Sequence, residues 1–200
     1  MIKRLLAAAA ALVSTSVLAG ELPPMTWAEY HACKYNEGQT PASVADFADS
    51  WNAWMDSEDR DDYSAAILNP LYRSPPTAVD MLWVGATSSN ESMAAGQSAW
   101  RSSEVFNDWP ASDCSISMLA TQYAVGSPIP ENVMTDEMVV AYWYCNLNEG
   151  STIQDVYTAH SATMQAGAEA GAVQESRIIV PRQGVPAQFA QYDFMVSYVH

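Results

Sequence analysis

The stretch CKYNEGQTPASV at residues 33–44 returns as CNLNEGSTIQDV at residues 145–156, and this near-repetition decides the fold. Six of the twelve positions are identical, at a constant spacing of 112 residues. Two copies of one small motif usually pack as pseudo-symmetric halves, so the repeat predicts a duplicated architecture. The repeat carries no chemistry of its own.

Each copy of the motif predicts a strand, a tight turn and a helix. Gly38 and Gly150 can take the positive φ that such a turn needs. Thr40 and Thr152 are good helix N-caps, and Pro41 suits the first helical position because its missing N–H costs nothing there. The apolar residues that follow recur every three to four positions, which is typical of an amphipathic helix.

Reading outward from the motif, we expect the first copy to run strand, helix, strand, strand, helix, strand. The expected strands lie at 26–35, about 64–73, 79–84 and from Cys114 onward. The first helix is expected to start at Pro41, and Asn90 is expected to cap a second helix that runs to about residue 107. On the last strand we place Cys114, Ile116, Met118 and Ala120 on one face, and Ser115, Ser117 and Thr121 largely on the other.

The second copy is expected to repeat this order over a shorter length. A strand at 138–147 and a helix from 153 come first, and residues 178–181 and 192–194 echo the second and third strands of the first copy. The chain stops soon afterwards, so we expect either a shortened copy or a fragment. The expected division is 1–19 signal peptide, 20–125 copy one, 126–137 linker and 138–200 copy two.

The order βαββαβ is that of the ferredoxin-like unit, whose last strand lies beside its first. On this order and the shared Cys-x-x-Asn-Glu-Gly-x-Thr motif, the chain resembles the dimeric α/β-barrel superfamily in tandem, single-chain form. That group includes NIPSNAP-like, EthD-like and antibiotic-monooxygenase-like proteins. The resemblance implies an α+β fold in which two antiparallel sheets face each other as a single-chain α/β barrel. No catalytic motif of a member family is present, so no functional residues are carried over.

The N-terminus predicts export. Lys3 and Arg4 precede an apolar stretch at 5–18, and Val17-Leu18-Ala19 offers a cleavage site before Gly20, as in a secretory signal peptide. The stretch is too short for a good membrane span. We therefore expect a soluble periplasmic or secreted protein without a membrane anchor.

The charge of the chain excludes some partners. Cleavage would remove two of the eight basic residues, leaving six against 23 acidic ones and a formal charge of −17. Such a charge repels nucleic-acid phosphates and anionic lipid, so neither is an expected partner. An acidic, Lys-poor surface suits a saline environment, but ordinary solubilising charge explains it as well.

The three cysteines lie in the exported part, where disulfides persist. Cys33 and Cys145 occupy equivalent places on the two first strands. Cys114 opens the strand that neighbours the first strand in a ferredoxin-like sheet, so Cys33–Cys114 is the favoured disulfide and Cys145 is left free. Three small buried thiols remain the alternative.

Five residues are candidates for ligand binding. His31 aligns with Trp143 across the repeat, so the two copies differ there. Asp80 and Asp193 occupy matching places on the third strands, where they either form an acid/base pair in a barrel lumen or begin strands at its rim. Trp83 follows Asp80 on the same strand. His160 lies on an apolar helix stripe, which favours a core histidine over a haem or metal ligand.

The sequence predicts no cofactor and no metal site, and it contains no Gly-rich phosphate loop, no Gly-x-Ser-x-Gly and no Cys-x-x-Cys. We read it as an exported soluble binding or interaction module for a small hydrophobic molecule or a protein partner. The alternative is a cofactor-independent oxygenase or isomerase with its chemistry in the barrel lumen.

Overall fold

The computed structural model describes residues 21–72, 79–128, 138–172 and 175–199. The expected signal peptide at 1–19 and most of the expected linker at 126–137 lie outside these residues.

The elements follow one another in two similar series. The first is β1 (Thr26–Tyr35), α1 (Pro41–Ser57), β2 (Tyr63–Leu68), β3 (Met81–Thr87), α2 (Asn90–Ser102), a short 3-10 helix (Val105–Asp108) and β4 (Ala111–Val125). The second is β5 (Val140–Cys145), α3 (Ile153–Glu169), β6 (Glu175–Gln183) and β7 (Phe194–Val199). The fold is α+β, and the described part of the second series ends at its third strand.

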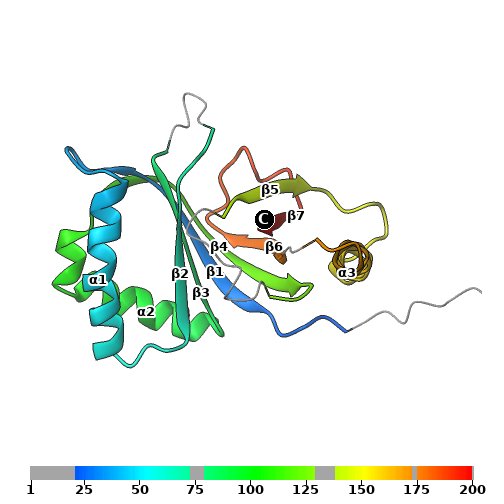
Figure 1. The fold of residues 1–200 in the computed structure, drawn as a ribbon, viewed down its shortest axis with the longest axis horizontal. Helices are drawn as coiled ribbons and strands as arrows, with labels where there is room; N and C mark the ends of the chain where they lie inside the picture. Colours follow the sequence, from blue (N-terminus) through cyan, green and yellow to red (C-terminus); the bar gives the residue numbers. More distant parts are fainter. Residues whose placement is uncertain (1–20, 73–78, 129–137, 173–174, 200) are drawn as a thin grey trace, which may run out of the picture.

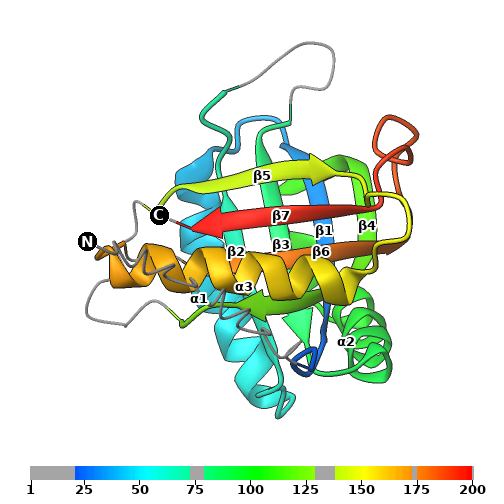
Figure 2. The same ribbon diagram turned by 90° about the vertical axis from the view of Figure 1, so that its right-hand side faces the viewer.

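All seven strands belong to one antiparallel sheet in the order β2-β3-β1-β4-β6-β7-β5. The first four strands have the ferredoxin-like order, with β4 beside β1, and the order β6-β7-β5 repeats three of those positions. The two halves are therefore joined along β4 and β6, where Thr121 pairs with Val180. The joined sheet curls so that its halves face each other (Figures 1 and 2).

Within the described residues, β2 and β5 are the two edge strands of the curled sheet. In the first half β1 pairs on both sides, with β3 and β4, whereas its counterpart β5 pairs only with β7 among the described residues. The edge of β5 is the edge at which a fourth strand of the second half would pair.

The repeated motif forms the same turn in both halves. Gly38 has φ 78° and Gly150 has φ 76°, in the left-handed region that favours glycine. In each turn the residue after the glycine donates its N–H to the carbonyl of the asparagine two positions before the glycine, at 2.9 Å in both. The residues shared by the two motifs thus form turns of closely similar geometry.

The helices lie outside the curled sheet, with α1 and α2 against the first half and α3 against the second (Figure 1). The inner, concave face is filled by a cluster of buried side chains from β1, β4, β6 and β7: Ala28, Tyr30, Met118, Ala120, Ile179 and Met195. Two further clusters lie beneath the helices, one including Cys33, Val44 and Met81 and the other Met164, Ile178 and Phe194. Among the described residues, no helix is long and apolar enough to cross a membrane.

A bulge in β4 corrects the expected face of Cys114. Between the pairs Ala32–Ile116 and Lys34–Ser112, β1 advances by two residues and β4 by four. Asp113 takes φ 48° within this bulge. The two extra residues turn Cys114 away from the face of Ile116 and toward α1 and α2, because the alternation of faces holds only in a regular strand.

Two expected helix limits also change. The N-cap of α2 is Ser89, whose Oγ accepts a hydrogen bond from the Ser92 N–H at 3.0 Å, and Asn90 is already the first helical residue. The helix ends at Ser102 instead of near residue 107, and the short 3-10 helix at 105–108 completes the segment.

Candidate ligand-binding site

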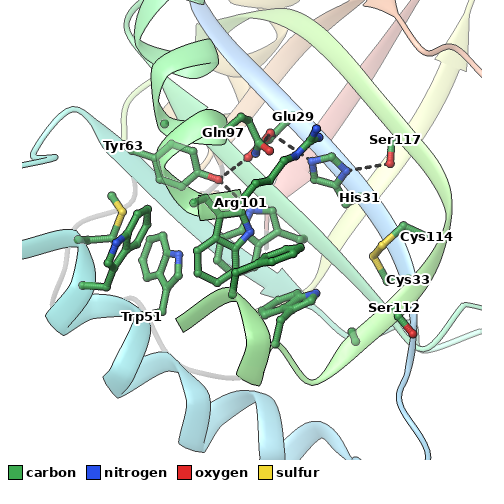
Figure 3. A pocket seen from close by; sticks show the side chains of 18 of the residues that line it. Glu29, His31, Cys33, Trp51, Tyr63, Gln97, Arg101, Ser112, Cys114 and Ser117 are labelled. Atoms are coloured by element: carbon green, nitrogen blue, oxygen red, sulfur yellow. Dashed lines mark hydrogen bonds and ion pairs between the residues drawn. A yellow bond between two sulfur atoms is a disulfide. The ribbon is translucent and has the colours of Figure 1, made fainter. Parts of the chain in front are cut away.

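A pocket of about 410 Å³ lies between the outer face of the first half-sheet and helices α1 and α2. Its lining is largely aromatic: it includes Trp51, Trp54, Tyr63, Trp83, Trp100, Phe106 and Trp109 (Figure 3). Five of the seven tryptophans of the chain therefore surround one cavity.

Local structure explains why the tryptophans gather here. Trp51 and Trp54 lie one turn apart on α1, and Trp83 lies on the outward face of β3. The rings then pack edge to face: Trp51 and Trp83 have centroids 5.3 Å apart, and Trp83 and Trp109 5.4 Å. The rings therefore pack against one another and also line the pocket.

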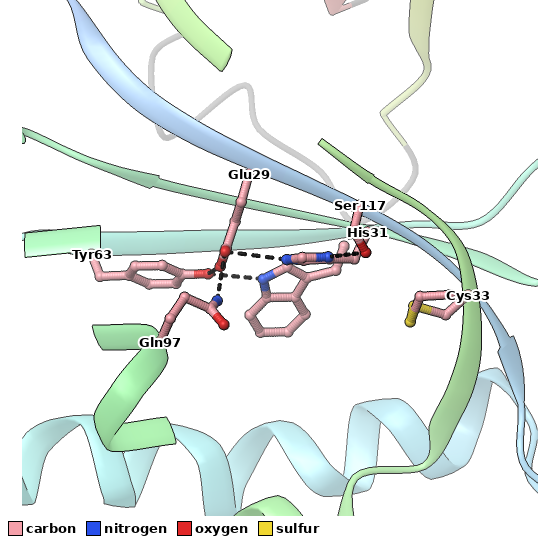
Figure 4. Close-up of polar contacts among 8 residues, drawn as sticks. Glu29, His31, Cys33, Tyr63, Gln97 and Ser117 are labelled. Carbon is pink, nitrogen blue, oxygen red and sulfur yellow. Dashed lines mark hydrogen bonds and ion pairs between the residues drawn. A yellow bond between two sulfur atoms is a disulfide. The ribbon is translucent and has the colours of Figure 1, made fainter. Parts of the chain in front are cut away.

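The polar part of the pocket centres on Glu29 of β1, which is only 5% exposed. Its Oε1 accepts a hydrogen bond from the Tyr63 hydroxyl at 2.6 Å, and its Oε2 accepts one from Gln97 Nε2 at 2.5 Å. His31 Nε2 lies 3.1 Å from Oε2 (Figure 4). Three donors from three different elements thus satisfy one buried carboxylate.

These donors keep Glu29 ionised. Burial by itself would raise the pKa of Glu29, but the hydrogen bonds from His31, Tyr63 and Gln97, together with the charge of His31, outweigh it and hold the pKa below its ordinary value. The pKa of Tyr63 moves the other way, raised by burial and by the nearby Glu29 carboxylate. Tyr63 therefore stays a neutral phenol whose O–H donates a hydrogen bond to Glu29.

Gly85 on β3 makes room for this arrangement. A Cβ at this position would lie 1.8 Å from the Tyr63 hydroxyl oxygen, 2.4 Å from its Cζ and 3.0 Å from Glu29 Oε1. Gly85 pairs with Glu29 on one side and Ala65 on the other, so the Tyr63 side chain crosses the sheet directly over the glycine. Trp83 Nε1 also donates to the Tyr63 hydroxyl, at 2.8 Å.

His31 links Glu29 to Ser117 of β4. His31 and Ser117 are direct cross-strand partners, so their side chains stand side by side on the outer face of the sheet. His31 Nδ1 lies 3.0 Å from Ser117 Oγ. The ring is thus held at both nitrogens, and Figure 4 shows this line of contacts from Ser117 through His31 to Glu29.

Two arginines, Arg60 and Arg101, line the same pocket. Only six basic residues follow position 19 in the whole chain, so this is a concentration of positive charge in an acidic protein. Arg60 donates through Nη2 to the Ala95 carbonyl at 3.3 Å. Its Nε is buried and has no hydrogen-bond partner within the described part of the chain.

The disulfide forms another wall of the pocket. Cys33 and Cys114 are joined, with their Cα atoms 3.9 Å apart, and both line the cavity (Figure 3). Cys145 is a free thiol in the second half. The bond crosslinks β1 to the bulged start of β4 beside the histidine.

Of the five residues predicted for ligand binding, the structure brings two together. His31 and Trp83 are cross-strand partners and both line the pocket. Trp143 lies on β5 in the other half and is 61% exposed. Asp80 and Asp193 are not among the residues that line the pocket.

Asp80 and Asp193 play the same structural part in the two halves. Asp80 Oδ2 accepts a hydrogen bond from the Tyr35 N–H at 3.1 Å, and Asp193 Oδ2 accepts one from the Leu147 N–H at 2.8 Å. Each aspartate also donates its own N–H to the carbonyl of the cysteine two residues before that partner, at 2.9 and 3.0 Å. These are strand-start residues at the ends of the sheet, in separate halves of the molecule.

His160 has a structural environment. Its Nε2 lies 2.7 Å from Ser176 Oγ, and its ring packs edge-on against Tyr198. Burial lowers the pKa of His160. Within the described residues, no group of three or more His, Cys, Asp or Glu side chains could hold a metal ion.

Sequence reasoning missed four polar residues of the site: Glu29, Tyr63, Gln97 and Ser117. Glu29 had a readable signal, since it alternates in register with His31 and Cys33 and is therefore an acid on the covered face of a central strand. Tyr63 and Gln97 carry no such signal, because only tertiary packing brings β2 and α2 to Glu29.

The lumen of the curled sheet, where the alternative function placed its chemistry, is occupied by Tyr30, Met118, Ile179 and Met195. The aromatic pocket lies on the opposite face of β1, because its lining residues Glu29, His31 and Cys33 alternate with the lumen residues Ala28 and Tyr30. The two spaces are separated by the sheet itself.

No protein-family model and no curated protein matches the sequence. Solved structures do match the fold. A mutant chlorite dismutase from Candidatus Nitrospira defluvii has a TM-score of 0.50 at 9% identity, over 87% of this chain and 76% of that one. What the two share is the fold. Another mutant of that enzyme, in complex with cyanide, has a TM-score of 0.49 at 10% identity, over 87% of this chain and 75% of that one. The chlorite dismutase from the same organism in complex with imidazole has a TM-score of 0.48 at 9% identity, over 87% of this chain and 76% of that one.

The match to the first of these structures agrees with the α+β fold. At such low identity it carries no information on the ligand or on the reaction of this chain.

Proposed function

We propose that this protein binds a small, largely apolar molecule in the aromatic pocket. The observation that carries the proposal is the group of five tryptophans around a cavity of about 410 Å³, within the usual size range of small-molecule sites. Ordinary core packing would fill such a space with side chains, whereas here the rings enclose it.

The two arginines favour a ligand that also bears a negative charge. Arg60 and Arg101 line the pocket, and the buried Nε of Arg60 offers a hydrogen-bond donor that has no acceptor in the described part of the chain. A carboxylate or sulfonate on an apolar body would pair with this charge while the body packs against the indole rings.

Export to the periplasm or the exterior belongs to the same proposal. The signal-like N-terminus motivates it, and the Cys33–Cys114 disulfide supports it because such bonds persist in oxidising compartments. Expression of the full chain with mass analysis of the periplasmic product tests it: we expect cleavage before Gly20.

A matched pair of fluorescent probes tests the binding proposal. 8-Anilinonaphthalene-1-sulfonate and neutral N-phenyl-1-naphthylamine share an apolar body and differ in charge. Both are expected to gain fluorescence and to quench the tryptophans, and the anion should bind about 10-fold more tightly, since one charged hydrogen bond is worth about 1.5–3 kcal/mol.

Two variants change the pocket in this test, and a third, in the other half of the molecule, serves as the control. Trp51→Ala should weaken both probes, and Arg101→Gln should weaken only the anion. Trp143→Ala, at an exposed position outside the pocket, is the control and should change neither. Equal loss with Trp143→Ala, or no binding by the wild type, would refute the proposal.

An enzyme remains the second candidate, because the Glu29–His31 pair adjoins the pocket. A cofactor-independent oxygenase or isomerase would use this pocket as its substrate site, since packed side chains occupy the lumen. Turnover of a bound apolar acid, lost on replacing His31 by Gln, would favour it over simple binding.

A further inference from the structure

His31 lies between the side chains of Ser117 and Glu29, and no sequence motif predicts this arrangement of three groups. Ser117 Oγ lies 3.0 Å from His31 Nδ1, and His31 Nε2 lies 3.1 Å from Glu29 Oε2. A hydroxyl, an imidazole and a carboxylate in this order are the elements of a serine nucleophile with its general base and the group that orients the base. All three residues line the aromatic pocket.

We propose that Ser117 is a nucleophile activated by His31, and that the protein cleaves a small ester whose acyl part is apolar. This activity rests on the proposed function, since the aromatic pocket would hold the acyl group. It adds a covalent step to binding.

The hydrogen-bond partners fix the direction of proton transfer. An ionised carboxylate only accepts, so the bond to Glu29 requires the proton of the neutral imidazole to be on Nε2. Nδ1 is then the basic nitrogen, and the Ser117 hydroxyl donates to it. In the best-known serine hydrolases the two nitrogens have exchanged roles, but the requirement is geometric and the chain order is free.

Hydrogen bonds fix the Glu29 carboxylate in the orientation that it needs in order to position His31. The Tyr63 hydroxyl and the Gln97 amide donate to its two oxygens at 2.6 and 2.5 Å, so the carboxylate cannot rotate away from His31. Gly85 leaves the space that lets Tyr63 reach it. Ionised Glu29 then stabilises the imidazolium that forms when His31 takes a proton.

Ser117 is open to the pocket from the other side. The residue is exposed, and 26% of the His31 side chain is exposed, so a substrate carbonyl can approach the hydroxyl without displacing the sheet. The side chain stands on the outer face of β4, opposite the buried lumen residue Met118. A strand position of this kind keeps the oxygen fixed beside its base.

The reaction balances without a redox partner. Ser117 Oγ attacks the ester carbonyl carbon while its proton passes to His31 Nδ1, giving a tetrahedral oxyanion. The bond to the leaving alcohol then breaks, and His31 returns the proton to that alcohol oxygen. Water attacks the acyl-Ser117 ester, again giving its proton to Nδ1, and collapse restores Ser117 and releases the acid. The positive charge of Arg101 in the same pocket is available to the oxyanion.

The test uses the exported, oxidised protein with a fluorophosphonate, which modifies activated serines, and with p-nitrophenyl butyrate as the ester. Peptide mass analysis should find the phosphonyl group on Ser117. Ser117→Ala should lose labelling and lower turnover of the ester by about 100-fold or more. Ser64→Ala is the matched control, because Ser64 is also an exposed strand serine of this sheet but does not line the pocket, and it should keep both.

Glu29→Gln should lower kcat with little change in KM, because Glu29 orients His31 and does not touch the ester. The wild-type labelling result depends on no variant folding correctly. Labelling elsewhere, or no labelling while the naphthalene probes still bind, would overturn the nucleophile and leave the binding function standing. Loss of both labelling and probe binding in the wild type would overturn the two together.

Discussion

Replacing Gly85 by Ala should break the polar cluster of the pocket. The new Cβ would lie 1.8 Å from the Tyr63 hydroxyl oxygen and 2.4 Å from Cζ, well inside contact distance, so the Tyr63 ring has to leave. Its bond to the Glu29 carboxylate is worth about 1.5–3 kcal/mol, and the bond from Trp83 about 0.5–1.5 kcal/mol. Alanine returns about 0.5–1 kcal/mol through its lower backbone entropy. We expect a net loss of about 2–3 kcal/mol.

Equilibrium urea unfolding, followed by tryptophan fluorescence, measures this loss. Gly96→Ala in α2 is the control: its Cβ would meet only the flexible end of Arg60, at 3.4 Å, so the helix should be unchanged or stabilised by up to about 1 kcal/mol. The decisive comparison repeats Gly85→Ala in a Tyr63→Ala background, where the clash with the ring no longer exists. Most of the cost should then disappear, since only the 3.0 Å approach to Glu29 Oε1 remains. An equal cost in both backgrounds would refute the reasoning, as would a Gly85→Ala protein as stable as the wild type.

Three further predictions concern other parts of the molecule. The pKa of Glu29 in the folded protein lies below its ordinary value of 4.5, so ionised Glu29 stabilises the fold above that pH, and this contribution is lost as the pH falls through the folded pKa. The difference in unfolding free energy between wild type and Glu29→Gln should therefore be larger at pH 7 than at pH 3, and a difference independent of pH would contradict this. Titration of thiols in the denatured, unreduced protein should find one thiol, that of Cys145, and finding three would exclude the disulfide. Replacing both Cys33 and Cys114 by Ser should lower the free energy of unfolding in urea by about 4 kcal/mol, because the disulfide closes a span of 81 residues. Asp193→Ala should destabilise the fold by about 1–2 kcal/mol, because the Leu147 N–H loses its acceptor, and the naphthalene probes should bind as before. A folded variant that no longer binds the probes would show that Asp193 acts on the pocket.

Local chemistry is what the sequence could determine. The motif at 33–44 and 145–156 predicts a turn that needs a left-handed glycine, and both glycines adopt it, with φ 78° and 76°. Threonine caps and helical periodicity place α1 and α3 to within a residue at their starts. These features depend on neighbours within a few positions, so short-range steric and hydrogen-bonding rules suffice to predict them.

The order of strands followed from the same local elements, because few arrangements of a βαββ unit bury one face of its sheet. How the halves meet did not. The pairing of β4 with β6 joins strands that are separated in the sequence by the linker, β5 and α3, and it turns two expected sheets into one curled sheet. The bulge opposite Cys33 could not be predicted either, because the alternation of apolar and polar residues in a strand does not indicate where two extra residues interrupt it.

The candidate site belongs to the tertiary structure almost entirely. The sequence pointed to His31 and Trp83, but it also pointed to Asp80 and Asp193, whose carboxylates turned out to bind backbone N–H groups at strand ends. A residue type and its spacing do not say what its side chain faces. That is decided when β1, β2, β4 and α2 converge on Glu29, since only packing over long sequence separations brings Tyr63, Gln97 and, through His31, Ser117 to one carboxylate.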